Sequence, residues 1–554
     1  YGTAVTKSNY EAARKYCMKT SECRGIFEPL GYYTARSHDY HPGSFYFFKE
    51  ITPTRIPVIG GKVHLKSDYS VSPSNRAPGY WDHDHLITDN SNQAVTRSSI
   101  GAAQAYCRDN ADCAGFFAPQ ASYSVRGVSY YPGSYYFFTR ITPTRVSVTG
   151  GKVHSKKLIH RDDVMSLSAF NHYRNTSFEQ RPSLEGASWS KGISKLVADI
   201  AKNKLWADYK SHIVSTRATE MTQVTRQINE HDVFEMTIDN KTMPFAYYQF
   251  GSEPEGGYSL LINLHGGGTG SHQLNEQNWA GFIPYRPNAI PNGLITVSPR
   301  SLAPAWNMWW QPDVDGFLDR IVTNMIAFRN VNPNKVYLTG YSAGGDGVYH
   351  LGPRMADRWA GAMMSAGHPN GAKMESLYNT CYGIAMGKQD SAHNRYNVAV
   401  QYADRLGQLQ NQYGGYRYTT GFYDTGHGMG GRESSQLNWV MQCNRIDTPA
   451  KVVWNVRQND RFYWLKTQNT SRGLFEVVRS GNTFNVEQAP NSMHFILRFN
   501  DRMIKFGNAV KVKNQLGQVE GTCTPSRKIS VILNTIIERG DPKQVYSDEC
   551  TIQM

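Results

Sequence analysis

One glycine-rich segment has the residue types of a serine nucleophile held in a tight turn. It reads Gly340-Tyr-Ser342-Ala-Gly-Gly345 and contains the spacing Gly-x-Ser-x-Gly. A short apolar strand is expected before this turn, and a helix after it, from Ala343 to about Met355. The small residues let strand and helix approach closely while the serine occupies a strained conformation. We therefore expect the Ser342 hydroxyl to face a reaction site, where the Ala343 N–H and the helix N-terminus can stabilise an oxyanion.

A second glycine-rich segment follows a run of apolar residues that begins at Leu260. The sequence passes from Leu-Leu-Ile-Asn-Leu directly into His265-Gly-Gly-Gly268. Residues without a Cβ let the backbone turn sharply and present bare N–H groups to a substrate oxygen. We therefore expect Gly267 and Gly268 to complete an oxyanion hole with Ala343, and His265 to support their loop. The alternative is an ordinary flexible loop after a strand.

An alcohol is a poor nucleophile near neutral pH, so Ser342 needs a base and an acidic residue that orients the base. After a serine turn of this kind, the acid precedes the histidine in the chain. Asp390 follows an apolar run, 382–387, that is expected to form a strand. His427 lies on a glycine-flanked loop after a second expected strand, 417–423. The sequence therefore predicts Ser342, Asp390 and His427 as catalytic residues.

Other polar residues near these strands are weaker candidates for the same roles. Asp424 is the alternative acid. His368 also follows an expected strand, but it precedes Asp390 in the chain and is expected to line the pocket. His393 is too close to Asp390 in sequence to reach around the site. Three tryptophans before the nucleophile turn are expected to form either one pocket wall or part of the core: Trp306, Trp309 and Trp310.

These motifs resemble the α/β-hydrolases of the esterase and polyhydroxybutyrate-depolymerase type. The similarity is carried by Leu264-His-Gly-Gly-Gly, by the run 331–345 and by Gly426-His-Gly-Met, within about a third of the chain. The longer segment 340–370 is similar to phospholipase/carboxylesterase-like proteins. The resemblance implies a mostly parallel sheet flanked by helices and a Ser-Asp-His triad. It also implies ester hydrolysis through an acyl-enzyme, without a metal or an organic cofactor.

The N-terminal part of the chain is a tandem repeat. PGSFYFF recurs as PGSYYFF, and ITPTR and GGKVH recur unchanged, all at an offset of 90 positions. This predicts two copies of one small α+β module, at 1–64 and 91–154. Each copy has two cysteines at the same spacing, which predicts one local disulfide per copy: Cys17 with Cys23 and Cys107 with Cys113. A helix ending in cysteine and followed by Cys-x-Gly resembles PAN/apple-type modules, which bind carbohydrate or protein.

The eight cysteines also bear on cellular location. Paired cysteines at a repeated spacing favour an oxidising compartment, and free buried thiols in a cytosolic protein are the alternative. The other four are expected to form two further disulfides: Cys523 with Cys550 and, by elimination, Cys381 with Cys443. The chain begins at Tyr1 without Met, which fits either a mature product after signal removal or a trimmed chain. We predict a secreted, extracellular protein.

Lysine and arginine exceed aspartate and glutamate by 14 in the 554 residues. Such an excess attracts anionic partners, for example acidic polysaccharide, a lipid headgroup layer or nucleic acid. The basic residues are dispersed, without a block of five, a zinc-finger spacing or an RNP-like segment, so no nucleic-acid partner is expected. The sequence also has no run of about 18 apolar residues, so we predict no membrane span.

The pattern changes between and after these segments. Residues 65–90 are rich in Ser, Pro and Asn and are expected to be a linker, and residues 155–230 predict a helical connecting region. The hydrolase domain is expected at 231–448, opening with a hairpin. Alternating apolar residues then predict a β-rich C-terminal domain at 449–554, with 528–533 among its expected strands.

Two classes of function remain open. The first is an active esterase, in which the paired N-terminal modules raise the effective concentration of a polymeric or surface-bound ester. The second is an extracellular structural, adhesive or filament-forming protein that uses the hydrolase fold as a scaffold and assembles with itself. The full set of catalytic residue types favours the first.

Overall fold

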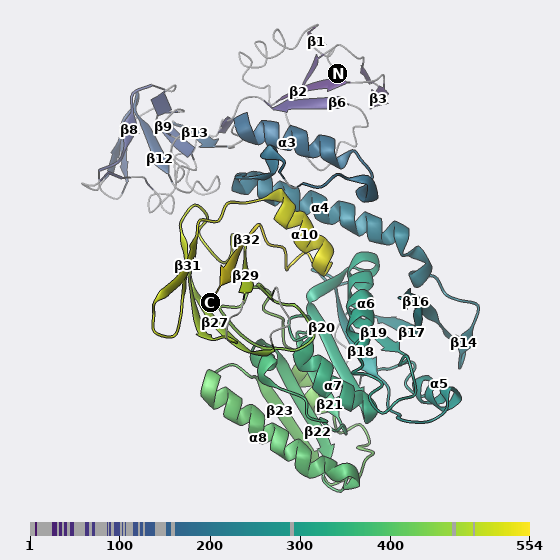
Figure 1. Ribbon diagram of the computed structural model, residues 1–554. Helices are drawn as coiled ribbons and strands as arrows, with labels where there is room; N and C mark the ends of the chain where they lie inside the picture. Colours follow the sequence, from purple (N-terminus) through teal and green to yellow (C-terminus); the bar gives the residue numbers. More distant parts are fainter. Residues whose placement is uncertain are drawn as a thin grey trace. The chain divides into compact units, whose positions relative to one another are not determined.

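The computed structural model describes nearly all of the chain from residue 161 onward, and separate segments before it. The described residues are 6–7, 25–29, 33–35, 38–40, 45–48, 61–65, 69–72, 86, 88–89, 93–99, 102–103, 106, 115–119, 122–125, 128–138, 151–156, and 161–553 without 185, 288–292, 468–471 and 491–493. The chain divides into two compact units, Tyr1–Met165 and Ser166–Met554 (Figure 1).

The first unit contains one set of strands twice, at the 90-residue offset of the repeat. In the first copy these are β1 Thr6–Lys7, β2 Gly25–Pro29, β3 Tyr33–Ala35, β4 His38–Tyr40, β5 Phe45–Phe48 and β6 Gly61–Leu65. In the second copy they are β8 Thr96–Arg97, β9 Gly115–Pro119, β10 Tyr123–Val125, β11 Val128–Tyr130, β12 Tyr135–Phe138 and β13 Gly151–Lys156. The central strand of each copy, β2 or β9, pairs antiparallel with two others.

The second copy has a small aromatic core, in which Phe116 and Phe137 are fully buried. The expected linker 65–90 contains a strand, β7 Tyr69–Ser72, which pairs with β13 and so extends the sheet of the second copy. Four cysteines lie outside the described residues: Cys17, Cys23, Cys107 and Cys113. Their disulfides and the PAN/apple resemblance therefore stay predictions.

Helices follow the repeats, as the pattern of residues 155–230 predicts. They are α3 Arg161–Arg174, α4 Lys195–Thr216 and short 3₁₀ turns at Phe178–Gln180, Ser188–Ser190 and Ala218–Met221. The Ser194 hydroxyl caps α4 by accepting a hydrogen bond from the Val197 N–H at 3.3 Å. Val197, Ala201 and Leu205 recur every four residues and are buried, which gives α4 one apolar face.

The centre of the second unit is an eight-stranded sheet. Its order is β16 Phe234–Ile238, β17 Lys241–Phe250, β19 Leu294–Pro299, β18 Tyr258–Leu264, β20 Val331–Tyr341, β21 Gly361–Ser365, β22 Cys381–Gly387 and β23 Tyr418–Tyr423. The strands β16 and β17 form the expected hairpin, and a shorter one, β14 Gln227–Ile228 with β15 His231–Asp232, precedes them. From β19 to β23 neighbouring strands are parallel, so the prediction of a mostly parallel sheet is confirmed.

Helices flank this sheet, as expected for parallel strands that are buried on both faces. They are α5 His272–Ala280, α6 Val314–Arg329, α7 Ala343–Arg354, α8 Arg395–Tyr413 and α9 Ser434–Val440, with 3₁₀ turns at Glu375–Asn379 and Ala392–Asn394 (Figure 1). Every residue of β18, β21 and β22 is buried. In sheets of this kind, ligands bind at the carboxyl ends of the strands, so the loops that follow β18, β20, β21, β22 and β23 are where a functional site is expected.

The C-terminal residues form two packed sheets, in agreement with the predicted β-rich domain. One contains β24 Lys451–Val456, β27 Gly473–Ser480, β28 Thr483–Gln488, β30 Val510–Lys513 and β31 Val519–Cys523; the other contains β25 Arg461–Phe462, β26 Leu465–Thr467, β29 His494–Phe499 and β32 Asp548–Gln553. Buried aromatic rings join them, such as Phe475 and Phe495 at 5.1 Å between ring centroids.

One expected strand of this region is wrong. Of residues 528–533, all but Lys528 belong to a helix, α10 Ile529–Arg539. Its β-branched residues favour a strand locally, but Ile529, Ile532 and Ile536 fall on one helical face and are buried against α4. Tertiary packing therefore overrides the local preference.

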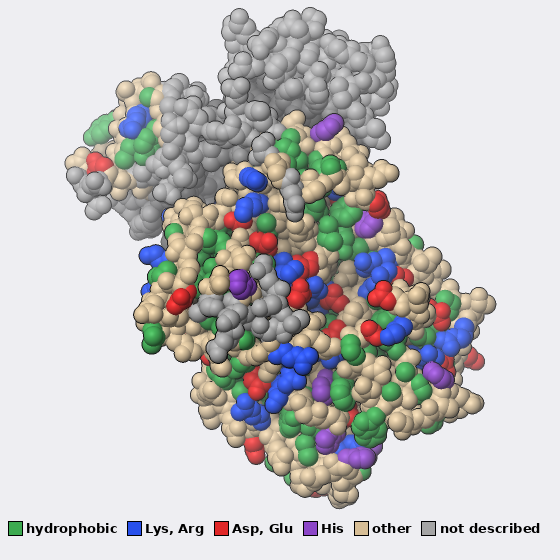
Figure 2. All heavy atoms as spheres, viewed as in Figure 1, with side chains coloured by type: hydrophobic (Ala, Val, Ile, Leu, Met, Phe, Trp, Pro, Cys, Tyr) green, Lys and Arg blue, Asp and Glu red, His purple; other side chains and the backbone are tan. Residues whose placement is uncertain are grey.

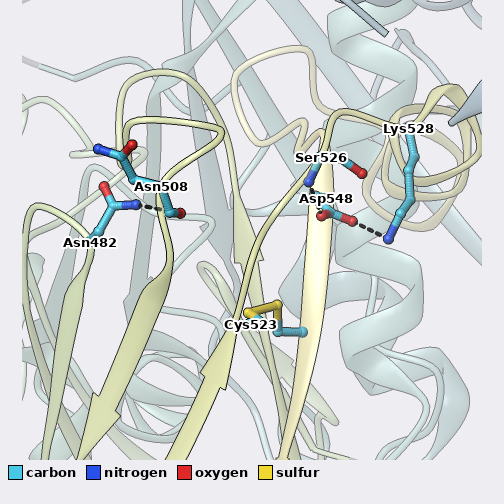
Figure 3. The surroundings of a disulfide bond; sticks show 7 residues. Asn482, Asn508, Cys523, Ser526, Lys528 and Asp548 are labelled. Atoms are coloured by element: carbon cyan, nitrogen blue, oxygen red, sulfur yellow. Dashed lines mark hydrogen bonds and ion pairs between the residues drawn. A yellow bond between two sulfur atoms is a disulfide. The ribbon is translucent and has the colours of Figure 1, made fainter. Parts of the chain in front are cut away.

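Two predicted disulfides are present in the second unit. Cys381 is bonded to Cys443, and Cys523 to Cys550. The second bond joins β31 to β32, so it links the two C-terminal sheets near the ion pair of Lys528 with Asp548 (Figure 3).

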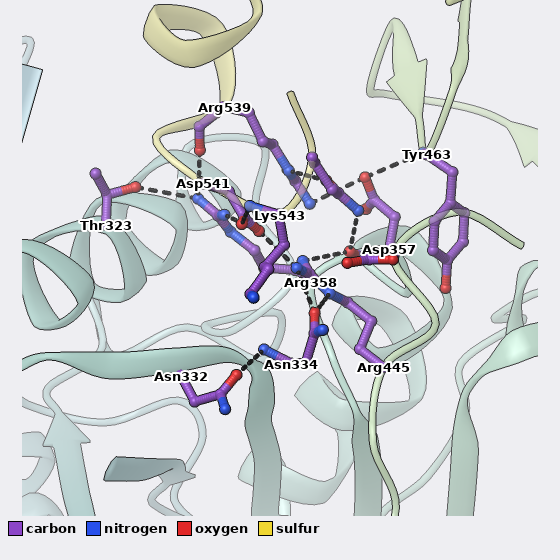
Figure 4. A network of polar contacts seen from close by, with 12 residues as sticks. Thr323, Asn332, Asn334, Asp357, Arg358, Arg445, Tyr463, Arg539, Asp541 and Lys543 are labelled. Carbon is purple, nitrogen blue, oxygen red and sulfur yellow. Dashed lines mark hydrogen bonds and ion pairs between the residues drawn. The ribbon is translucent and has the colours of Figure 1, made fainter. Parts of the chain in front are cut away.

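A cluster of mostly buried ions joins the eight-stranded sheet to the C-terminal region. Three arginines each contact an aspartate: Arg358 with Asp319 at 2.9 Å, Arg445 with Asp541 at 2.7 Å and Arg539 with Asp357 at 2.9 Å. Figure 4 labels the residues of the second and third pairs. Arg358 and Asp541 have no exposed area. Burial lowers the pKa of Arg358 to about 10, whereas Arg445 and Arg358 outweigh burial and hold the pKa of Asp541 below its ordinary value.

The surface carries charges of both signs. Figure 2 shows Lys and Arg side chains interspersed with Asp and Glu over the visible face of the second unit, in line with the dispersed charge of the sequence. Within the described ranges, no helix is both long and apolar enough to cross a membrane.

Candidate active site

Ser342 lies in the turn between β20 and α7. Its backbone has φ 56° and ψ −123°, which is uncommon for a residue with a side chain and costs roughly 1–3 kcal/mol. The turn is so compact that it requires glycine at two positions. A Cβ on Gly340 would overlap the carbonyl of Gly344, and a Cβ on Gly344 would overlap the carbonyl of Leu264. The Ser342 N–H donates to the Ser365 carbonyl of the next strand at 2.9 Å. The strained nucleophile turn expected from the sequence is therefore formed.

The structure brings the three predicted catalytic residues into one chain of hydrogen bonds. His427 Nε2 lies 3.0 Å from Ser342 Oγ, and His427 Nδ1 lies 2.6 Å from Asp390 Oδ2. Asp390 is buried, with 3% of its surface exposed, whereas the His427 side chain is 39% exposed. A buried carboxylate at Nδ1 fixes the proton there, which leaves Nε2 free to accept the serine proton.

The loops that carry Asp390 and His427 are aligned by an extension of the sheet beyond β22 and β23. The Lys388 N–H donates to the Tyr423 carbonyl at 2.7 Å, and the Gln389 N–H donates to the Thr425 carbonyl at 2.9 Å. The Tyr341 hydroxyl, next to the nucleophile, donates to the His427 carbonyl at 3.0 Å. The loops that follow two neighbouring strands are thus held side by side.

Two charged residues that the sequence analysis did not single out stand behind this chain of hydrogen bonds. Arg395, the first residue of α8, places a guanidinium nitrogen 3.7 Å from Asp390 Oδ1 and is buried. Asp346 lies one helical turn after Ser342, and burial raises its pKa to about 6 although hydrogen bonds to the carboxylate oppose that rise. The one-turn spacing from Ser342 could have pointed to Asp346; no sequence signal marks Arg395.

The alternative residues do not contact the serine. His368 donates its backbone N–H to Asp346 at 2.6 Å, and its imidazole is hydrogen-bonded to Asn370. The Asp424 side chain is 78% exposed and forms an ion pair with Lys388 at 2.9 Å. Neither residue therefore competes with Asp390 or His427 in this geometry.

The His-Gly-Gly-Gly loop lies against the nucleophile. A Cβ on Gly266 would sit 3.2 Å from the Cβ of Ser342, which shows how closely the two segments approach. Gly267 has φ 141°, and a Cβ there would lie only 3.0 Å from the Asn278 side chain. The loop thus passes the Ser342 side chain with bare backbone, as an oxyanion hole requires.

His265 is part of the support of this loop. Its Nε2 accepts a hydrogen bond from the Ser301 N–H at 3.1 Å, so Nδ1 carries the proton and donates to the Gly266 carbonyl at 2.7 Å. Trp309 Nε1 donates to the His265 carbonyl at 2.8 Å. Burial lowers the pKa of His265 to about 4, so the imidazole is neutral at physiological pH.

The three tryptophans before the nucleophile turn have different environments. Trp309 is fully buried, and Trp310 stacks on His350 with 4.2 Å between ring centroids. Trp306 is 44% exposed and contacts the glycine loop. Trp309 thus belongs to the core, Trp310 is half-buried, and Trp306 lies at the border of the candidate site.

The described residues contain no group of three or more His, Cys, Asp or Glu side chains that could hold a metal ion. Catalysis without a cofactor stays a prediction.

Comparison with known proteins found one short sequence match and distant structural ones. An acetylxylan esterase of Xylanibacter ruminicola is 39% identical over 94 residues, which are 17% of this chain and 16% of that protein. The chain therefore spans about a sixth of the length of the curated relative that it matches. No protein-family model matches the chain.

Among solved structures, a thermostable esterase is 19% identical with a TM-score of 0.30, over 39% of this chain and 64% of its own. The BES protein from Bacillus cereus is 13% identical with a TM-score of 0.29, over 40% of this chain and 98% of its own. Est1E from Butyrivibrio proteoclasticus is 13% identical with a TM-score of 0.26, over 38% and 96%.

Proposed function

We propose that this protein is a serine esterase in which Ser342 attacks the carbonyl carbon of a carboxylic ester. The observation that carries the proposal is the continuous contact from Ser342 Oγ through the His427 imidazole to Asp390, at 3.0 and 2.6 Å. This geometry supplies a nucleophile, a base and a group that orients the base.

In the first half of the reaction, His427 Nε2 takes the proton of Ser342 as the oxygen attacks the carbonyl carbon. The carbonyl oxygen becomes an oxyanion, for which the N–H groups of Gly267, Gly268 and Ala343 are the proposed donors. The C–O bond to the alcohol then breaks, and the alcohol leaves with the proton from His427. An acyl group remains on Ser342.

In the second half, water attacks the acyl-enzyme. His427 accepts a proton from this water, and Asp390 again holds the imidazole in the same tautomer. Collapse of the second oxyanion returns the proton to Ser342 and releases the carboxylic acid. One water is consumed for each ester cleaved, and the chain is restored.

The acyl group that we propose first is acetyl. The support is the match to a protein named an acetylxylan esterase, which covers a small part of both chains. We also propose an extracellular location, supported by the two disulfides of the second unit, and substrate-holding partners for the N-terminal repeats.

A fluorophosphonate probe tests the proposal directly because it labels only an activated serine. The wild-type protein is expected to be labelled and to hydrolyse 4-nitrophenyl acetate, and Ser342→Ala is expected to do neither. Ser434→Ala, which alters a half-buried serine at the start of α9, is the control. Well-folded wild-type protein without labelling would favour the structural or adhesive role instead.

A further inference from the structure

Trp306 is an exposed aromatic side chain at the edge of the candidate site. A Cβ on Gly268 would lie 3.5 Å from its ring, so the indole lies beside the last residue of the His-Gly-Gly-Gly loop. The same loop, two residues earlier, lies against Ser342. Since 44% of the Trp306 surface is exposed, much of the ring is open to a molecule that approaches the serine.

His393 lies beside Trp306. Their ring centroids are 5.3 Å apart and their planes meet at 60°. His393 follows Asp390 by three residues, in the loop between β22 and α8. The two rings therefore connect the proposed oxyanion loop with the loop of the acid, at the border of the candidate site.

The pair offers an apolar face together with polar edges. His393 is exposed, and within the described residues neither its ring nitrogens nor Trp306 Nε1 has a hydrogen-bond partner in the protein. An indole is a large, flat apolar surface that loses little side-chain entropy on binding, and its N–H remains a donor. Trp306 thus supplies the surface, and His393 supplies a donor and an acceptor at an angle to it.

We propose that Trp306 and His393 form the subsite for the alcohol part of the ester, and that this alcohol is a sugar ring. A pyranose has the matching chemistry, because one face consists of C–H groups and hydroxyls surround its edge. A simple alkyl alcohol or an aryl alcohol has no hydroxyl besides the esterified oxygen, so it offers no hydrogen-bond partner to the imidazole. The inference rests on the proposed function, since it assigns the leaving group of that same reaction.

The test compares three esters that share one acyl group. They are a mono-O-acetylated methyl xylopyranoside, phenyl acetate and ethyl acetate. In Trp306→Ala, kcat/KM for the glycoside is expected to fall at least tenfold further than for ethyl acetate, mainly through KM. Trp306→Phe is expected to recover part of this loss, because a flat ring returns. The matched control is Leu516→Ala, an exposed apolar residue in the β30–β31 loop.

His393→Ala separates the polar edge from the apolar face. It is expected to lower kcat/KM about threefold or more for the glycoside relative to phenyl acetate, because only the sugar has hydroxyls for the imidazole. Equal losses on all three esters in both variants would mean that the rings only support the loops, and would overturn the proposal. A Trp306-dependent preference for phenyl acetate over the glycoside would overturn it as well.

Binding without turnover separates this proposal from the proposed function. Calorimetric titration of Ser342→Ala with the acetylated glycoside is expected to show binding that the added change Trp306→Ala weakens at least fivefold. That result would support the subsite even if the wild-type serine were unreactive toward fluorophosphonate. Binding that is the same with and without Trp306 would contradict the subsite, even if the serine were fully reactive.

Discussion

Two clusters in the second unit are built from aspartate and a basic side chain, and they differ in access to solvent. At the junction with the C-terminal sheets, Arg358 and Asp541 have no exposed area. At the sheet edge, Asp390 is also buried, but the side chain of its partner His427 is 39% exposed and is hydrogen-bonded to Ser342. A carboxylate thus stabilises the fold where both partners are enclosed, and is placed for chemistry where its partner meets solvent.

The largest effect expected from this comparison is on catalysis. Asp390→Asn should lower kcat about 10⁴-fold, because an amide at Nδ1 favours the wrong imidazole tautomer. The midpoint of thermal unfolding should change little. Asp424→Asn, which alters the exposed aspartate after the neighbouring strand β23, should stay within about twofold in kcat by the same assay. Similar losses in both variants would break the assignment of the acid.

The enclosed cluster should respond in stability instead. Arg358→Met leaves Asp319 and Asp541 short of a partner and should lower the free energy of unfolding by about 3–5 kcal/mol. Denaturant unfolding measures this loss, and kcat per folded molecule should remain within a few-fold. Lys195→Met removes an exposed ion pair with Asp199 and should cost less than about 1 kcal/mol. A large fall in kcat for Arg358→Met would contradict a purely structural role for the enclosed cluster.

The buried imidazole of His265 should make the stability of the protein depend on pH. Its folded pKa of about 4 lies below the ordinary 6.5, so the unfolded chain binds the proton more tightly. The stability due to neutral His265 is complete above pH 6.5 and is lost as pH falls toward about 4, by about 3 kcal/mol. Unfolding titrations should show this slope in the wild type and not in His265→Gln. The same slope in both proteins would assign it to other groups.

The smallest expected effect concerns the loop of the base. Tyr341→Phe removes the hydroxyl that donates to the His427 carbonyl and should lower kcat about three- to tenfold. The thermal midpoint should shift by only a few degrees. An unchanged kcat would show that the sheet extension alone positions His427.

The sequence predicted the parts of the site that depend on local pattern. The serine turn requires glycine at neighbouring positions, and Asp390 and His427 each follow an apolar strand by a few residues. Because parallel strands end at one edge, these local signals were enough to bring three distant side chains together.

Features that depend on packing between distant segments were not predictable in this way. Nothing in the sequence near Arg395 indicates that its guanidinium lies beside Asp390. The apolar residues at 529–533 form a helix because α4 covers one of its faces. Trp306, Trp309 and Trp310 are identical in type, and only the fold makes the first exposed, the second buried and the third half-buried.

The disulfide between Cys381 and Cys443 closes a ring of the chain, with the two cysteines 62 positions apart. Asp390 and His427 both lie within this ring, whereas Ser342 lies outside it. The exposed residues 391–394 separate the acid from the base along the backbone and are open to proteases. A single cut there leaves both fragments covalently joined, so the nicked protein runs as one band on a denaturing gel until a reductant divides it.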